Sequence, residues 1–286
     1  MHVHTGMGYR FRIVNVFTVD GDRLSGNPLC VFEDARGMST EQMQALARQM
    51  NLSETTFVLP SDKATAHVRI FTPGFEMPFA GHPTLGTAHV VRALRGGDRV
   101  TFEMKAGIVD VTAQGDTWTL RAAQPPKTRP APERADLAAM LSLPAEAISD
   151  EPLWVSTGVE QLVIPVATAE HVRAAKPVPT LIVKHGYSEA RDEAMAYVWA
   201  ADGDHLLVRF FFTQHGSVIE DPATGSACAN LGGWLVAKGK PLPYRATLHQ
   251  GEYAGRPSQL GLFVDDAKNI FVTGAATELG HGELTL

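Results

Sequence analysis

The chain has 286 residues, 44% of them hydrophobic and 20% charged, which excludes disordered and collagen-like classes and allows one large domain or two ordinary ones. The net charge of −6, without any stripe or tail of basic residues, argues against a nucleic-acid partner. No apolar run reaches the roughly 18–20 residues that cross a bilayer, the first residues lack a secretory signal, and two cysteines make no disulfide framework. We therefore expect a cytoplasmic protein with no membrane partner.

The first part of the chain predicts several strands and a helix. Ser39 and Gln42 resemble a capping box, and apolar residues at helical spacing follow them, which predicts a helix that ends near Met50. Alternating or continuous apolar runs predict strands at 12–18, 29–32, 54–59 and 66–71.

A proline-rich stretch divides the chain. Residues 122–134 predict an extended linker, which places a domain boundary near residue 125. Beyond it, further strands are predicted at 162–166, 195–199 and 206–212. The sequence thus predicts an α/β (α+β) protein with one domain at 1–124, to which a C-terminal strand at 276–286 is a candidate addition, and a second domain at 125–275.

A faint internal repeat relates the two halves. In residues 69–94 and 209–237, an arginine precedes a short apolar run, a proline-containing loop follows, and a glycine opens a small-residue, helix-like stretch. Gly81 and Gly225 lie 144 residues apart, about half the chain. The repeat suggests that one architecture occurs twice.

The glycine-led stretches are candidate anion sites. A helix that begins near Pro83 or Thr84 would expose unpaired N–H groups suited to a carboxylate, and His82 would lie beside that anion as a donor or proton carrier. The plain alternative is a capped helix with an incidental histidine. Asp221 and Ser226 of the second stretch are likewise either helix caps or substrate-binding groups. Together, two helix starts could hold a small anionic molecule in a cleft between the halves.

Two further residue types could carry proton chemistry. Glu54 starts a strand whose next residues are apolar or small, so burial would raise the pKa of its carboxyl toward neutrality, as an acid/base catalyst needs; most glutamates, however, are solvated. Cys30 and Cys228 could form a racemase thiol pair, although free cysteines usually act as small buried hydrophobes. Dinucleotide, phosphate-loop, nucleophile-elbow and zinc motifs do not occur in the sequence, so we predict neither a cofactor nor a metal.

Several motifs together resemble the phenazine-biosynthesis isomerase (PhzF-like) family. They are NVFTVDGDRLSGNPLCVF, LSETTFV, IFTPGFEMPFAGHPTLGTAHV, STGVEQLVIPV, EDPATGSACANLG and QGEYAGRPS, which run in the family's order from residue 14 to 258. The resemblance implies a diaminopimelate-epimerase-like fold, in which two similar halves each curl a mostly antiparallel sheet around a central helix, with the active site between them. It also implies a homodimer.

The resemblance assigns roles to residues. Glu54 would remove and return a proton on a small carboxylate-bearing substrate such as trans-2,3-dihydro-3-hydroxyanthranilate. His82 and Asp221 would orient the substrate and stabilise charge. Gly81, Gly225 and Ser226 would bind it. Relatives that are true epimerases carry thiols at the helix starts, where this chain has glycine and threonine, so the resemblance disfavours the two-thiol alternative.

Three other functions remain open on the sequence. They are a two-thiol racemase or epimerase, a non-catalytic small-molecule-binding protein that kept the scaffold, and a hydrolase built on Ser226 with His82, which lacks the usual nucleophile context.

Overall fold

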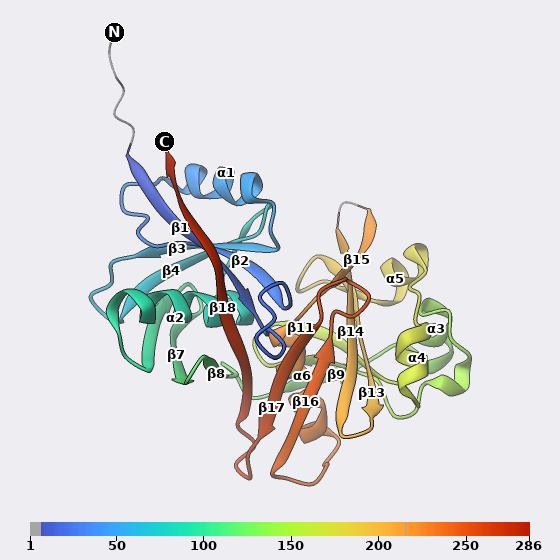
Figure 1. The fold of residues 1–286 in the computed structure, drawn as a ribbon. Helices are drawn as coiled ribbons and strands as arrows, with labels where there is room; N and C mark the ends of the chain where they lie inside the picture. The colour runs from blue at the N-terminus through green and yellow to red at the C-terminus, as the bar shows by residue number, and fades with distance from the viewer. Residues whose placement is uncertain (1–6, 215) are drawn as a thin grey trace. The chain divides into compact units, whose positions relative to one another are not determined.

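The computed structural model of the chain describes residues 7–214 and 216–286 (Figure 1). These residues form two compact units. Unit 1 comprises the described residues up to Leu120 together with Gly274–Leu286, and unit 2 comprises Arg121–Thr273. The sequence predicts the boundary near residue 125, and unit 2 begins at Arg121. It predicts the returning strand from residue 276, and the second segment of unit 1 begins at Gly274.

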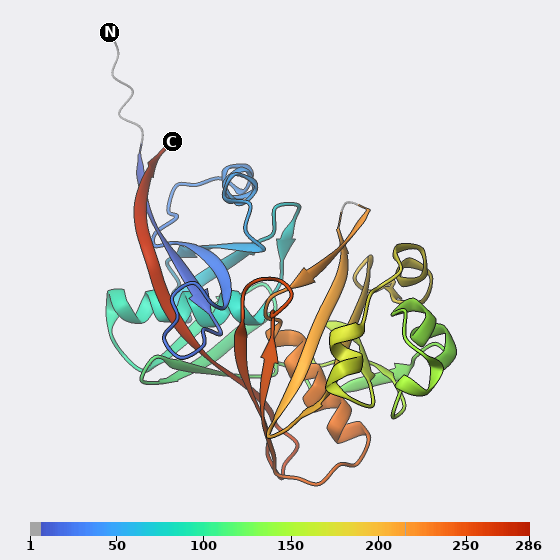
Figure 2. The same ribbon diagram turned by 45° about the vertical axis from the view of Figure 1, so that its right-hand side comes forward.

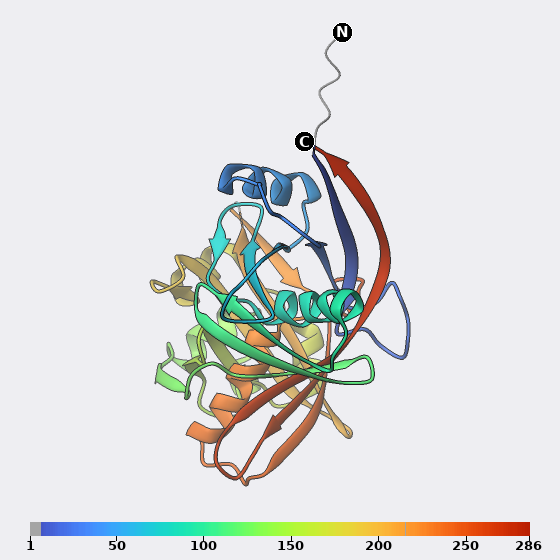
Figure 3. The ribbon, with the colours of Figure 1, turned by 90° about the vertical axis from the view of Figure 1, so that its left-hand side faces the viewer.

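Unit 1 is a sheet with a helix on either face. Met43 and Leu46 of the first helix pack with Phe57 on one face, while Thr56 of the same strand meets Thr87 of the second helix on the other (Figure 3). The elements are β1 (Gly8–Val16), β2 (Asn27–Phe32), α1 (Thr40–Met50), β3 (Glu54–Leu59), β4 (Ala66–Phe71), β5 (Glu76–Met77), α2 (Gly81–Arg95), β6 (Arg99–Met104), β7 (Gly107–Gln114), β8 (Thr117–Arg121) and the greater part of β18 (Ile270–Thr285).

Unit 2 has the same kind of construction, with one buried helix on its sheet, and it contains further, shorter helices (Figure 2). The buried helix packs on β10, β11 and β17, and the short helices α4 and α5 pack on β13. The elements are β9 (Lys127–Pro130), α3 (Arg134–Met140), the 3-10 turn η1 (Ala145–Ala147), β10 (Leu153–Ser156), β11 (Glu160–Pro165), α4 (Ala169–Ala174), α5 (Pro179–His185), β12 (Tyr187–Ser188), β13 (Glu193–Asp202), β14 (His205–Gln214), β15 (Ser217–Asp221), α6 (Gly225–Ala237), β16 (Tyr244–Gln250) and β17 (Ser258–Val264).

The strand registers show that the repeat is structural. β4 pairs antiparallel with β3 and β5 and parallel with β6, and β14 pairs antiparallel with β13 and β15 and parallel with β16. Phe71 faces Glu76 in the first hairpin as Phe211 faces Glu220 in the second, and a helix begins five residues after each glutamate. The sequence repeat therefore encodes the same strand–hairpin–helix construction twice.

The central helices are buried on nearly every side, which explains their small residues. In α2, a Cβ atom at Gly86 would lie 2.6 Å from Leu29 Cδ2 and 2.8 Å from Val16 Cγ2. Glycine is therefore needed for the close approach of this helix to the sheet. The conclusion matches the burial of ten of the fifteen α2 residues, since a helix buried all round needs no polar face.

The prediction of an extended linker at 122–134 is wrong in part. Residues 127–130 form β9, which pairs antiparallel with β10, and α3 begins at Arg134. Proline fixes an extended backbone and lacks an N–H donor, which an edge strand tolerates, so Pro130 can end this strand opposite Leu153. Among the described helices, none combines the length and the apolarity that a membrane crossing requires.

Candidate active site

Two residues predicted from separate motifs meet in unit 1. Glu54 is the first residue of β3, and His82 is the second residue of α2. Glu54 Oε2 lies 3.6 Å from His82 Nε2, and the two side chains are only 15% and 6% exposed. The fold therefore brings an acid and an imidazole together in a largely buried position, although 27 residues separate them in the sequence.

The surroundings of His82 fix its protonation state. Burial lowers the pKa of this imidazole to about 4, so the ring is neutral near pH 7. The ring is hydrogen-bonded to the backbone carbonyl of Pro28, and its Nε2 has no hydrogen-bond partner among the described residues. The bond to Pro28 must then come from Nδ1–H, which leaves the Nε2 lone pair directed at Glu54. Here His82 is a proton acceptor rather than a cation.

The helix that carries His82 has an uncapped start. Its N-cap residue, Ala80, has no side chain that could accept a hydrogen bond, and its first turn has no acidic residue. In the same unit, α1 has the complete capping box that the sequence predicts, formed by Ser39 and Gln42. The alternative of an ordinary capped helix is therefore wrong for α2, whose first N–H groups keep their capacity to bind an anion.

The start of α6 in unit 2 is also uncapped, and it contradicts the interpretation of Asp221 and Ser226 as simple caps. The N-cap Thr224 makes no side-chain hydrogen bond to the first turn. Its hydroxyl instead donates to the Asp221 carboxylate. Ser226 Oγ lies 2.8 Å from the side-chain amide of Gln161. Both predicted residues are thus held by polar partners beside the helix start.

The side chain of Gln161, which contacts Ser226, is itself part of a buried hydrogen-bond network. Asn230, one turn further along α6, accepts hydrogen bonds of 2.8 Å from both the backbone N–H and the hydroxyl of Thr157, and its amide group contacts Gln161. Gln161 and Asn230 are fully buried. The side chain that holds Ser226 is therefore itself fixed by a network. No sequence motif indicates this network, because it joins Thr157 and Gln161 to two residues of α6 that lie more than 60 positions further along the chain.

The two cysteines do not form a reactive pair. Cys30 lies in β2 of unit 1 and Cys228 in α6 of unit 2, and both thiols are fully buried. Burial raises the pKa of Cys30 to about 12 and raises that of Cys228 further. Since the thiolate is the reactive form, this environment is that of structural cysteines. The described residues also contain no group of three side chains suited to a metal ion.

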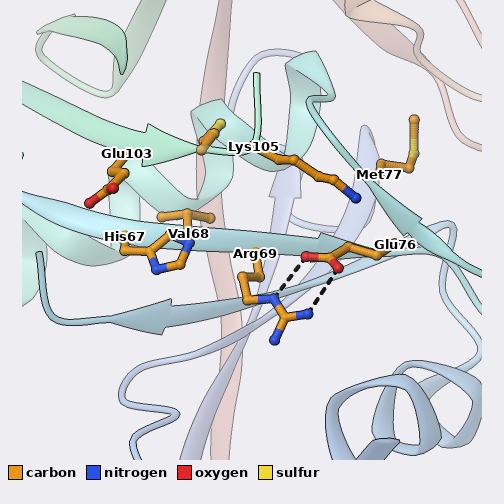
Figure 4. A pocket seen from close by; sticks show the side chains of 8 residues that line it. His67, Val68, Arg69, Glu76, Met77, Glu103 and Lys105 are labelled. Atoms are coloured by element: carbon orange, nitrogen blue, oxygen red, sulfur yellow. Dashed lines mark hydrogen bonds and ion pairs between the residues drawn. The ribbon is translucent and has the colours of Figure 1, made fainter. Parts of the chain in front are cut away.

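An arginine–glutamate ion pair precedes each of the two helices in the sequence. In unit 1, Arg69 Nε and Nη2 each donate to Glu76 across 2.8 Å, beside a surface depression of about 270 Å³ (Figure 4). In unit 2, Arg209 donates to Glu220 across 3.0 and 2.7 Å. The sequence repeat included both arginines, but it did not reveal that each one pairs with the glutamate that precedes the helix by five residues.

Comparison with known proteins supports the resemblance. Residues 14–282 match the phenazine biosynthesis-like protein family. An uncharacterized isomerase of Pasteurella multocida is 34% identical over 96% of this chain and 94% of its own length. A trans-2,3-dihydro-3-hydroxyanthranilate isomerase of Pseudomonas aeruginosa is 35% identical over 88% of this chain and 89% of its own.

Solved structures show the same fold. A phenazine biosynthesis protein of the PhzF family from Bacillus anthracis superimposes with a TM-score of 0.85, at 24% identity and coverage of 98% of this chain and 100% of the other. A hydroxyproline epimerase from Agrobacterium vitis, 12% identical, shares the fold with a TM-score of 0.63 over 100% and 94% of the two chains. The chain has a mixed α/β fold that matches both, and it belongs to the phenazine biosynthesis-like protein family of isomerases.

Proposed function

We propose that this isomerase moves a proton within a small carboxylate-bearing metabolite similar to trans-2,3-dihydro-3-hydroxyanthranilate, with Glu54 as both base and acid. The observation that carries the proposal is the contact of Glu54 with the neutral His82 at an uncapped helix start. The name of the Pseudomonas aeruginosa relative supports the choice of substrate class.

The proposed reaction needs one carboxylate that acts twice. The Glu54 carboxylate takes a proton from a carbon next to an unsaturated or carbonyl group. The C–H electron pair moves into the conjugated system while an O–H bond forms on Glu54. The acid then returns the proton to another carbon on the same face of the substrate, so the carboxylate is regenerated and no oxidant or reductant is needed.

The remaining predicted residues supply binding and charge stabilisation. The backbone N–H groups that begin at Gly81 are oriented donors in a place with little water, where such donors are most effective. His82 Nε2 accepts a hydrogen bond from the substrate or from protonated Glu54. In unit 2, we assign the corresponding substrate contacts to Gly225, Ser226 and Asp221. The homodimer, the cytoplasmic location, the reaction without cofactor and the shared cleft stay predictions.

Glu54→Gln tests this proposal. The variant keeps the size of the side chain but cannot take up a proton, so we expect incorporation of deuterium from solvent into trans-2,3-dihydro-3-hydroxyanthranilate to fall by about 10²–10⁴-fold, as measured by NMR. Glu189→Gln, at an exposed turn, is the matched control and should retain the wild-type rate. Circular dichroism establishes that both variants are folded.

Exchange that persists in Glu54→Gln would remove Glu54 from the proton transfer. If the wild-type protein neither exchanges nor converts any compound in a screen of small unsaturated carboxylates, the proposal fails, and the scaffold serves binding instead.

A further inference from the structure

One buried side chain in unit 2 joins three groups at the start of α6. Gln250, the last residue of β16, is 2% exposed. Its Oε1 accepts a hydrogen bond of 3.2 Å from the backbone N–H of Thr224. Its Nε2 donates to the backbone oxygen of Asp221 across 3.0 Å and to Thr224 Oγ1 across 2.9 Å. A single amide group thus fixes both residues that precede the helix.

These bonds determine what the Thr224 hydroxyl does. A threonine at an N-cap normally accepts a hydrogen bond from the first turn of its own helix. Here the hydroxyl accepts from Gln250 and donates to the Asp221 carboxylate, and it makes no bond to that turn. Gln250 therefore holds Thr224 away from the helix and against Asp221. The first-turn N–H groups of α6 keep their hydrogen-bonding capacity as a result.

The repeat shows that this amide is not required by the fold. The parallel strand pair β4–β6 of unit 1 corresponds to β14–β16 of unit 2. His67 pairs with Glu103 in the first, and Leu207 pairs with His249 in the second. The next residues, Met104 and Gln250, therefore occupy equivalent places. Met104 is also buried. Its sulfur receives only a long contact of 3.8 Å from the Thr84 hydroxyl. The same place in the scaffold is thus filled by an apolar side chain where no aspartate has to be held.

Local backbone geometry brings Gln250 close to its partners. The next residue, Gly251, has a positive φ of 84°, and a Cβ atom there would lie 2.5 Å from the Pro222 oxygen. Only glycine allows this approach of β16 to the segment before α6. Gly251 therefore allows the close approach of the two segments, and the side chain of Gln250 then hydrogen-bonds across it.

We propose that Gln250 is a positioning residue for substrate binding: it fixes Asp221 and keeps the start of α6 uncapped for the carboxylate of the substrate. This inference rests on the proposed function, because it assigns the substrate contact to that helix start. Glu54 and His82 make none of these bonds. The effect of losing Gln250 should consequently fall on KM rather than on kcat.

The test compares Gln250→Met with Gln259→Met. The first variant installs the residue that unit 1 has at the equivalent place, and the second makes the same change at an exposed position on the next strand. With trans-2,3-dihydro-3-hydroxyanthranilate, we expect Gln250→Met to raise KM about tenfold while kcat changes less than threefold and its pH profile is retained. Gln259→Met should leave both constants unchanged. Gln250→Glu keeps the acceptor for the Thr224 amide but loses both donated bonds and adds a carboxyl beside Asp221, so it should raise KM at least as much as Gln250→Met.

A second readout needs no substrate. Hydrogen–deuterium exchange of the free protein should be faster at the Thr224 amide in Gln250→Met than in the wild type or in Gln259→Met, since its acceptor is gone. If the wild-type protein turns over no compound in the screen of small unsaturated carboxylates, the proposed function fails, and hydrogen–deuterium exchange alone then tests whether Gln250 holds Thr224. The inference is overturned by unchanged exchange, by a KM within twofold of wild type in both Gln250 variants, or by a loss confined to kcat.

Discussion

The starts of α2 and α6 show how one construction serves two different chemical environments. In both, an arginine on the central strand pairs with a glutamate on the hairpin strand and lies over a phenylalanine, with 5.0 Å from Arg69 to the Phe71 ring and 4.6 Å from Arg209 to the Phe211 ring. A glycine then begins a buried helix without a side-chain cap. The two units therefore share the contacts that precede each helix start.

The residues around the two helix starts differ in kind. The start of α2 has Glu54 and a neutral imidazole, which can exchange a proton. The start of α6 has a hydroxyl, a carboxylate and a buried amide, which are joined by hydrogen bonds, and no histidine lies among them. In the proposed reaction both helix starts bind the substrate, whereas proton transfer is assigned to the start of α2 alone.

The strongest test of the shared part is to remove each arginine. Arg209 also donates to the carbonyl oxygens of Val172, Arg173 and Ala175, and its side chain is only 10% exposed. Arg209→Met leaves Glu220 buried without its cation, so we expect a loss of about 3–5 kcal/mol in the free energy of unfolding. Arg69→Met should cost about 1 kcal/mol, because that pair is nearer the solvent. Equal losses in urea unfolding at pH 7 would contradict this ranking.

The next effect concerns His82, since the equivalent position at the start of α6 is occupied by Ser226. The pKa of His82 falls from 6.5 in the unfolded chain to about 4 in the fold, so between these pH values the unfolded chain binds a proton that the folded chain does not. Stability should therefore decrease as the pH drops from 6.5 to 4, by roughly 3 kcal/mol. His82→Gln should remove this slope in urea unfolding, while His281→Gln, at an exposed position, should retain it. An unchanged slope in His82→Gln would show that other groups cause it.

A smaller effect follows from giving α2 the cap that it lacks. Ala80→Ser supplies a hydroxyl at the N-cap, which should raise the free energy of unfolding by about 1 kcal/mol and weaken substrate binding several-fold, because the hydroxyl competes for the N–H groups. Ser39→Ala, at the capped start of α1, should cost about 1 kcal/mol and leave KM unchanged. Tighter substrate binding by Ala80→Ser would show that these N–H groups do not bind the anion.

The smallest effect on activity is expected for the cysteines. Because burial raises the pKa of both thiols, the double variant Cys30→Ala/Cys228→Ala should keep its turnover within twofold of wild type, and intact protein should react slowly with an alkylating reagent at pH 8. Activity that disappears in the double variant, with the fold preserved, would support the two-thiol mechanism instead.

The sequence predicts elements best where local pattern decides them. β3 and β4 have the predicted bounds, and the capping box of α1 is present. β1 was predicted at 12–18 but spans Gly8–Val16: it ends where Phe17 takes a positive φ, and its first residues are ordered by pairing with β18, far away in the sequence. Such long-range pairing leaves no local signal.

The candidate site was predictable only in its composition. The motifs indicated Glu54 and His82, but their contact depends on a sheet that no local pattern specifies. The motifs also indicate Asp221, whereas Gln250, which holds it, is 29 residues away and has no helical or strand period in common with it. Candidate catalytic and binding residues can be picked from the sequence by the chemistry of their side chains. A residue that positions them by hydrogen bonds can be identified only from the folded structure.

The long strand β18 has a consequence for the order of synthesis. Its residues from Gly274 onward belong to unit 1 and pair with β1, so that Gly8 lies opposite Thr285. A ribosome makes the N-terminal part of this sheet first and its last strand only at the end. Unit 2 is translated without interruption between the two segments of unit 1. Unit 1, which contains Glu54 and His82, cannot complete its sheet before residues 274–285 have been made, so a variant that lacks them should leave β1 without this partner.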